Sequence, residues 1–372
     1  MQKILFNTRK DYLSNPGGDT TQILRTAAAL REFNIEIDIT SSLSPDLRQY
    51  DIVHLFNLTR VKETYLQCIN AKKNQKPIAL STNYWNTDEF NKNGLHHFSK
   101  RIFHRALKNN ETKFRLKKAI NHFYKLNTYE NMQLNIGLIK QQKFIAANSD
   151  ILLPNSYMEM DQLKKDLNIK TNYVVVYNSA DKRFKQGSPE NFLKKFKKYN
   201  LEKDNFVLCV SRIEDRKNIL RLIRAANKTD LKLVIIGKPN PSQQSYNRKC
   251  KKTAGPNIIF LNHMNQNELS SAYAAAKVHV LPSWYETPGL SSLEAGLAGC
   301  NLVSTDRGST REYFLNQIEY CDPSSIESIK KALIRAFNKQ KTKAMSNHIT
   351  SNFTWRKSCE QIISAYRQIS NK

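Results

Sequence analysis

The sequence predicts an α/β fold of two Rossmann-like domains that face each other across a cleft. The chain has 372 residues, and a single hydrophobic core rarely grows that large, so two domains are expected. Short apolar segments alternate with amphipathic ones in the first third of the chain, and the alternation starts again near residue 206. This alternation is typical of parallel sheets, which bind ligands at the carboxyl ends of their strands.

The expected elements follow in chain order. In the first half, strands are expected at KILFN, IEIDIT, DIVHLF and PIALST, and helices at TQILRTAAALREF and VKETYLQCINAKK. In the second half, strands are expected at NFVLCV, LKLVIIG, NIIFLN and VHVLPS, and helices at LRLIRAANKT and NELSSAYAAAK. The two halves meet near residue 180, so the first domain is expected to span residues 1–180.

Positive charge is concentrated in one stretch of a chain whose formal net charge is +27. Residues 1–91 carry 11 Lys and Arg against 10 Asp and Glu, whereas residues 92–143 carry 12 against 2. In this stretch Phe, Ile, Leu and Tyr are interleaved with Lys and Arg, which predicts basic helices. A solvated charged face and a segment lying on an anionic membrane are both open interpretations. Nucleic acid is another usual partner of basic surfaces, but the sequence holds no recognisable nucleic-acid-binding module.

Composition excludes several other classes. No apolar run approaches the ~20 residues of a membrane-spanning helix, and the first residues hold no apolar stretch of signal-peptide length. A cytoplasmic location is therefore expected. The six cysteines are scattered without metal-ligand spacing, so they are expected to be reduced core thiols and no metal site is predicted; they are Cys68, Cys209, Cys250, Cys300, Cys321 and Cys359.

The segment SWYETPGLSSLEAG, residues 283–296, carries two carboxylates around a helix start. Glu286 precedes the expected helix and Glu294 lies within it, while Gly289, Leu290 and Ser291 supply its first amides. Free amides at a helix N-terminus bind anions such as a diphosphate, and carboxylates grip sugar hydroxyls by accepting hydrogen bonds. The plainer alternative is one capping Glu and one surface Glu, but the apolar surroundings argue for burial.

Two further loops offer ligand contacts. Arg212 and Lys217, five residues apart after NFVLCV, can clamp a diphosphate and stabilise its charge as it leaves, although the neighbouring Glu214 and Asp215 could pair with them. Gly17 and Gly18 follow the first strand and let the backbone approach a ligand. No G-x-G-x-x-G pattern is present, so a dinucleotide redox cofactor is not supported.

Together these features resemble the retaining glycosyltransferases of family 4, which have the GT-B fold. The resemblance covers nearly the whole chain and is carried by NPGGDTTQILRTAAAL, VVVYNSADKRF, VSRIEDRKN and the Glu-x7-Glu block LPSWYETPGLSSLEAGLAG. It implies a donor-binding domain of residues 181–355 and a helix, residues 356–372, that returns to the first domain. It also implies a nucleotide-sugar donor, with Arg212 and Lys217 on the diphosphate, Glu286 on the sugar and Glu294 on the ribose.

The sequence departs from the family after the strand PIALST. Many members have a His there that contacts the donor sugar, whereas Asn83, Tyr84 and Trp85 stand here. These three are candidates for sugar or acceptor contacts, and an aromatic pair packed beneath the acceptor loop is the alternative. Asp88 and Glu89 are weaker candidates for the acceptor.

The resemblance implies transfer of a sugar with retention of configuration, without a metal or resident cofactor. The basic stretch favours a lipid-linked or other membrane-anchored glycan as acceptor, at the inner face of a bacterial-type membrane and in surface polysaccharide assembly (capsule, O-antigen or lipopolysaccharide). Three alternatives remain: a basic nucleic-acid-binding protein, a soluble sugar synthase with a small acceptor, and a catalytically silent scaffold.

Overall fold

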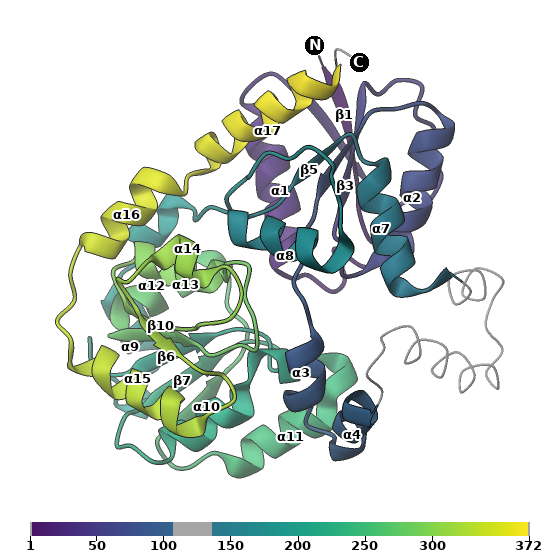
Figure 1. The fold of residues 1–372 in the computed structure, drawn as a ribbon. Coiled ribbons are helices and arrows are strands. Elements are labelled where there is room, and N and C mark those ends of the chain that lie inside the picture. Colours follow the sequence, from purple (N-terminus) through teal and green to yellow (C-terminus); the bar gives the residue numbers. More distant parts are fainter. Residues whose placement is uncertain (1, 107–135, 371–372) are drawn as a thin grey trace. The chain divides into compact units, whose positions relative to one another are not determined.

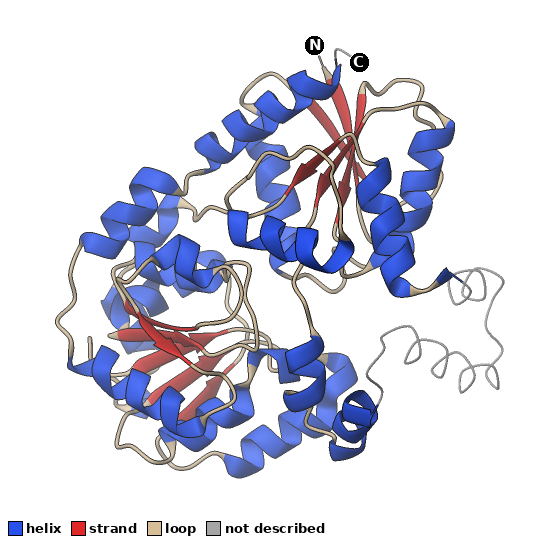
Figure 2. Ribbon diagram, viewed as in Figure 1, coloured by secondary structure: helices blue, strands red, loops and turns tan. Residues whose placement is uncertain are grey.

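The computed structural model describes residues 2–106 and 136–370. The chain divides into two compact units (Figure 1). The first unit combines Met1–Asn86, Ile102–Tyr177 and Trp355–Lys372, and the second combines Thr87–Arg101 with Asn178–Thr354. Each unit contains one parallel sheet covered by helices (Figure 2), so the α/β class with two Rossmann-like halves is confirmed.

The first unit has a five-stranded sheet of order β2-β1-β3-β4-β5. Its strands are β1 (Lys3–Asn7), β2 (Glu36–Thr40), β3 (Ile52–Phe56), β4 (Ile78–Ser81) and β5 (Ile151–Leu153). Its helices are α1 (Gly18–Arg31), α2 (Val61–Lys73), α7 (Leu138–Asn148), α8 (Tyr157–Leu167) and α17 (Trp355–Ser370). All five residues of β3 are buried, as expected for a parallel strand with helices on both faces.

Alternate residues of β1, β3, β4 and β5 enter two separate apolar cores. Leu5 of β1 packs with residues of α2, α7 and α8, whereas Ile4 and Phe6 pack with residues of α1 and α17. The period-two alternation of a strand therefore assigns its side chains to the two covering layers. Helix α17 supplies Cys359, Ile362, Ala365, Tyr366 and Ile369 to the second of these cores.

A buried histidine links this helix to the middle of the sheet. His54 of β3 is fully buried, with Nδ1 2.6 Å from the Tyr366 hydroxyl and Nε2 2.9 Å from the Ser81 hydroxyl. Burial lowers the pKa of His54 to about 3, because the charged imidazolium is poorly solvated there. The ring is therefore neutral at physiological pH.

This histidine predicts an acid-sensitive fold. In the unfolded chain His54 binds a proton below pH ~6.5, whereas in the folded protein it binds one only near pH 3. The contribution of His54 to the free energy of unfolding is therefore complete above pH 6.5 and is lost as the pH falls. The difference between the two pKa values corresponds to a loss of about 5 kcal/mol in the free energy of unfolding between pH 6.5 and pH 3. His54→Gln is expected to lower the melting temperature at pH 7.5 and to flatten its decline between pH 6.5 and 4. An equally steep decline in the variant would contradict this assignment.

The second unit has a six-stranded sheet of order β11-β10-β9-β6-β7-β8. Its strands are β6 (Val207–Val210), β7 (Leu233–Ile236), β8 (Ile258–Leu261), β9 (Val278–Leu281), β10 (Asn301–Thr305) and β11 (Glu319–Cys321). Its helices are α3 (Asp88–Asn93), α9 (Pro189–Lys195), α10 (Ile219–Ala226), α11 (Gln244–Thr253), α12 (Gln266–Ala275), α13 (Leu290–Leu297), α14 (Thr310–Phe314), α15 (Ile326–Asn338) and α16 (Ala344–Asn352). Because β10, β9 and β6 are parallel neighbours, the loops that follow them meet at one edge of the sheet.

The two units do not follow the predicted domain bounds everywhere. Residues 87–101 follow β4 and residues 82–86 of the first unit, yet they group with the second unit; we call residues 87–101 the inserted segment. Helix α4 (Phe98–Ala106) begins within it. The sequence placed residues 92–143 in the first domain, and residues 107–135 of that basic stretch lie outside the described residues. The segments predicted at 356–372 and 181–355 correspond closely to Trp355–Lys372 and Asn178–Thr354.

Three compositional expectations meet the structure as follows. All six cysteines are buried and free, which confirms them as reduced core thiols. Across residues 2–106 and 136–370, no helix has both the length and the apolar character needed to cross a bilayer. Within the same residues, no cluster of three or more His, Cys, Asp or Glu side chains is suited to hold a metal ion.

Candidate active site

The centre of the candidate site is a buried ion pair in the second unit. After β6 the chain passes through a short 3-10 turn, η3 (Asp215–Lys217), which directs Lys217 toward the loop after β9. The Nζ atom of Lys217 lies 2.5 Å from Oε1 of Glu286, and Nη1 of Arg216 lies 3.5 Å from the same oxygen. The side chains of Glu286 and Lys217 are 6% and 13% exposed, so this pair is shielded from water.

The charges in this pair set the protonation state of the carboxyl group. Burial raises the pKa of Glu286, but Lys217 and Arg216 more than offset this effect, and the pKa ends below its ordinary value. Burial and the positive charge of Arg216 lower the pKa of Lys217, while Glu286 acts in the opposite direction. Glu286 is therefore an ionised hydrogen-bond acceptor and a weak base.

The backbone of Glu286 is held by the loop after β10. The carbonyl of Glu286 accepts a 2.8 Å hydrogen bond from the Ser309 amide, and its amide donates to the Arg307 carbonyl at 3.4 Å. Gly308, between them, has φ +91°, and a Cβ atom there would lie 2.0 Å from the Glu286 carbonyl oxygen. Only glycine permits this approach, so the loop after β10 fixes the position of Glu286.

The predicted helix start is present. Helix α13 begins at Leu290, and Gly289 is its N-cap with φ +93° and ψ 87°. The Gly289 carbonyl accepts from the Ser292 and Leu293 amides. Helix geometry leaves the amides of Leu290 and Ser291 without acceptors inside the helix. These amides carry the partial positive charge of a helix N-terminus, a favourable environment for a phosphate.

The second carboxylate of the Glu-x7-Glu block is held by a tyrosine. The Tyr273 hydroxyl, on α12, donates a 2.9 Å hydrogen bond to Oε2 of Glu294. Tyr273 is fully buried, and burial together with the Glu294 charge raises its pKa well above the ordinary value. The phenol therefore stays protonated and orients a half-buried carboxylate.

Tyr273→Phe tests this orienting role. Loss of one hydrogen bond is expected to cost about 1 kcal/mol of stability. The resemblance assigns Glu294 to the ribose of the donor, so loss of its orientation is expected to raise the KM for the donor several-fold with little change in kcat. Tyr320→Phe, which removes a 2.6 Å hydrogen bond to the Leu315 carbonyl, is the matched control. Equal donor KM values in the two variants would show that Tyr273 does not orient Glu294 for donor binding.

The two acidic residues of the loop after β6, Glu214 and Asp215, have different partners. Arg212 lies 3.6 Å from Glu214, and Glu214 also accepts a 2.9 Å hydrogen bond from Asn240. Asp215 instead accepts from His96 of the inserted segment at 2.8 Å. The sequence allowed these acids to form ion pairs with Arg212 and Lys217. In the structure Arg212 lies beside Glu214, whereas Lys217 pairs with Glu286.

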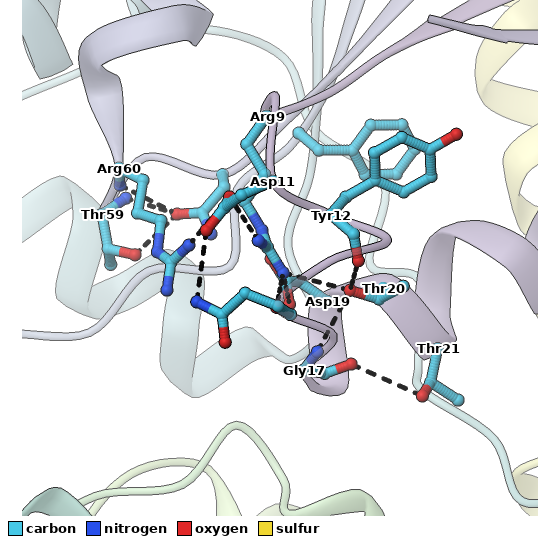
Figure 3. A network of polar contacts seen from close by, with 12 residues as sticks. Arg9, Asp11, Tyr12, Gly17, Asp19, Thr20, Thr21, Thr59 and Arg60 are labelled. Carbon is cyan, nitrogen blue, oxygen red and sulfur yellow. Dashed lines mark hydrogen bonds and ion pairs between the residues drawn. The ribbon is translucent and has the colours of Figure 1, made fainter. Parts of the chain in front are cut away.

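In the first unit, an arginine organises the loop that contains Gly17 and Gly18 (Figure 3). Arg9 is buried, and its guanidinium donates to both oxygens of Asp19, at 2.7 and 3.2 Å, to Asp11 at 2.5 Å and to the Thr20 hydroxyl at 3.1 Å. The Gly17 amide donates to Thr20 at 3.1 Å, so Gly17 caps α1, and Gly18 is exposed in its first turn.

The residues after β4 have distinct environments. Asn83 accepts a 2.7 Å hydrogen bond from Asn155, and Trp85 is half-buried. Tyr84 packs in the apolar core of the first unit and donates to Asp166 at 2.9 Å, as in the alternative of an aromatic packed beneath the loop. Asp88 lies in α3 of the second unit.

Sequence reasoning missed a buried carboxyl beneath the loop after β4. Glu159 of α8 accepts hydrogen bonds from the Thr82 hydroxyl, the Tyr84 amide at 2.8 Å and the Asn155 amide at 2.9 Å. Burial raises its pKa to about 7, although these hydrogen bonds oppose the rise. The signal available was weak, since Ser156 and Glu159 resemble an ordinary helix cap; Ser156 does cap α8.

Comparison with known proteins places the second unit in a family. Residues 191–353 match the family model described as glycosyl transferases group 1. These residues belong to that family. The match includes Lys217, Glu286 and Glu294, so the predicted resemblance to glycosyltransferases is confirmed at this level.

Individual relatives of the chain are distant. The O-antigen chain mannosyltransferase B of Escherichia coli is 25% identical over 191 residues, which cover 48% of this chain and 50% of that protein. The chain thus spans half or less of the length of the first curated relatives it matches.

Solved structures confirm the GT-B fold. Sucrose-phosphate synthase from Thermosynechococcus elongatus has a TM-score of 0.75 at 15% identity, covering 99% of both chains. Anabaena Alr3699/HepE in complex with UDP and glucose has a TM-score of 0.68 at 16% identity, covering 99% of this chain and 100% of that one. At such identities the likeness concerns the fold.

Proposed function

We propose that the protein transfers a sugar from a nucleotide-sugar donor to a glycan or lipid-linked acceptor, with retention of configuration. The observation that carries the proposal is the buried Lys217–Glu286 pair beside the N-terminus of α13. A cation, helix amides and an ionised carboxylate in one place match a diphosphate joined to a sugar. The second carboxylate, Glu294, is assigned to the ribose.

The reaction breaks the bond between the sugar C1 and the diphosphate oxygen, and the leaving diphosphate keeps the electron pair. Lys217, Arg212 and the amides of Gly289, Leu290 and Ser291 are assigned to stabilise that developing charge. The acceptor oxygen forms the new bond to C1 on the face that the diphosphate leaves. Because the pKa of Glu286 is lowered, Glu286 is suited to bind sugar hydroxyls, and we assign the departing diphosphate as acceptor of the proton.

No resident cofactor is proposed, and the protein cations and amides are assigned the charge stabilisation that Mg²⁺ provides in other transferases. The curated mannosyltransferase acts in O-antigen chains by its name, which supports a role in bacterial surface polysaccharide synthesis and a mannosyl donor. The net charge of +27 supports peripheral attachment to an anionic membrane at the cytoplasmic face. Asn83, Trp85 and Asp88 are the proposed acceptor contacts, and nucleic acid is not proposed as a partner.

A donor screen tests the proposal. Each nucleotide sugar, beginning with GDP-mannose and UDP-glucose, is added to the wild type, to Glu286→Gln and to the control Glu202→Gln, an exposed site. A ligand of the native state raises the melting temperature according to ln(1 + [L]/Kd). One donor is expected to stabilise the wild type and the control but not Glu286→Gln. Stabilisation of all three proteins to the same extent would show that Glu286 does not contribute to donor binding.

The acceptor and the stereochemistry need a second experiment. With the identified donor, lipid-linked glycans and small free sugars are compared as acceptors, and the product's anomeric configuration is determined by NMR. Retained configuration with a lipid-linked product supports the full proposal. Turnover with a small free sugar alone would make the protein a soluble sugar synthase, and binding of random duplex DNA in place of any donor would favour the nucleic-acid alternative.

A further inference from the structure

A cavity with several basic side chains in its lining lies within the second unit. It has a volume of about 140 Å³ and is lined by residues of the inserted segment, of the loop before α10, and of helices α10 and α11. The side chains that give it its character are His96, Arg101, Arg221, Arg224, Tyr246 and Lys249. Among its described lining residues none is acidic.

Arg221 of α10 is held in place by three contacts. Its guanidinium donates to the Asn93 carbonyl at 3.2 Å and to Oδ1 of Asn218 at 3.3 Å. It also stacks over the Trp284 ring, with 4.9 Å between the guanidinium carbon and the ring centroid. These acceptors and the ring are neutral, so the contacts position the guanidinium without cancelling its charge.

The other cations add to that charge. Burial lowers the pKa of Arg221, and the positive charges of Arg101 and Arg224 lower it further, although Tyr246 and Asp215 act in the opposite direction. Asp215 is already engaged by the ring and the amide of His96, at 2.8 and 3.2 Å. The cavity therefore gathers like charges whose mutual repulsion an anion would relieve.

The volume of the cavity and its arginine side chains limit which anions it can bind. Pockets for drug-sized ligands are roughly 300–1,000 Å³, so this cavity suits a small group. Arginine forks match the oxygens of phosphate. We propose that the cavity lined by Arg221, Arg224 and Lys249 binds a phosphate group, either that of a lipid headgroup or a free phosphate. This site does not depend on the proposed glycosyl transfer.

The test compares two variants with equal loss of charge. Arg224→Gln/Lys249→Gln changes two exposed residues at the cavity, and Lys251→Gln/Lys252→Gln changes two exposed residues elsewhere on α11. Pyrophosphate binding is measured by calorimetry on the full chain, and sedimentation is measured with vesicles of phosphatidylcholine and phosphatidic acid. Both variants retain Arg212, Lys217 and Glu286, so any pyrophosphate bound at the donor site contributes equally to both.

The cavity variant is expected to bind at least one of these probes about tenfold more weakly than the control variant. A difference with pyrophosphate alone would identify a free phosphate as the source, and a difference with vesicles alone would identify a headgroup. Equal binding of both probes by the two variants would overturn the proposal and assign the attraction to the basic surface as a whole. A screen for nucleotide sugars on both variants tests the donor site separately.

Discussion

Lys217→Met is expected to lower the melting temperature and to reduce turnover of the donor about 100- to 1,000-fold. Lys217 lies 2.5 Å from a carboxylate that is only 6% exposed. Removal of one partner from a buried pair leaves an uncompensated charge, which typically costs about 3–5 kcal/mol. Arg216, 3.5 Å from the same oxygen, is expected to reduce that cost. The turnover loss is expected because, in the proposed mechanism, the amine stabilises the departing diphosphate.

A double variant separates the two effects. Lys217→Met/Glu286→Gln removes both charges, so it is expected to recover much of the lost melting temperature while turnover stays low. Melting temperature and steady-state kinetics are measured for the wild type, both single variants and the double variant. Full recovery of turnover in the double variant would show that the pair serves folding alone.

Gly308→Ala is expected to destabilise the second unit strongly and to abolish measurable turnover. The added methyl carbon would lie 2.0 Å from the Glu286 carbonyl oxygen and 2.7 Å from its nitrogen. Both atoms belong to backbone, so relief requires Glu286 itself to move. The steric cost adds to about 1–2 kcal/mol for an L-residue in the left-handed region at φ +91°.

Gly299→Ala is the matched control for this prediction. Gly299 has φ +90°, and a Cβ atom there would meet nothing within 4 Å. It therefore reports the backbone cost alone, about 1–2 kcal/mol, and its turnover is expected to equal that of the wild type. The melting temperatures of both variants and their donor turnover are compared. Similar losses in both would mean that the contact between Gly308 and Glu286 has no special role.

The sequence predicted the fold because its signals were local and repeated. The apolar runs IVHLF and LVII are short and wholly buried as β3 and β7, and the glycine at residue 289 begins a helix as expected. The sequence placed Lys217 after the expected strand NFVLCV and Glu286 after VHVLPS, and in the structure they lie in the loops after β6 and β9. Their ion pair was not predicted, because the sequence suggested only Glu214 and Asp215 as acidic partners of Lys217.

Other parts of the site depend on contacts distant in sequence. Arg307 pairs with Glu89 at 2.9 and 3.1 Å, across 218 residues, and His96 reaches Asp215 across 119 residues. No period or local motif marks such pairs, so the association of the inserted segment with the second unit was not predicted. The roles of Arg216, Tyr273 and Gly308 were missed for the same reason, since each depends on which loop it meets.

Helix α17 has a consequence for synthesis of the protein. Its residues Cys359, Ile362, Ala365, Tyr366 and Ile369 complete one of the two cores of the first unit, yet they are translated after every residue of the second unit. The first sheet therefore emerges from the ribosome with one face incompletely covered. That face is fully covered only after residues 355–370 have been synthesised. We expect the second unit, apart from its inserted segment, to acquire protease resistance earlier in translation. Nascent chains halted before residue 355 should expose the first unit to chaperones.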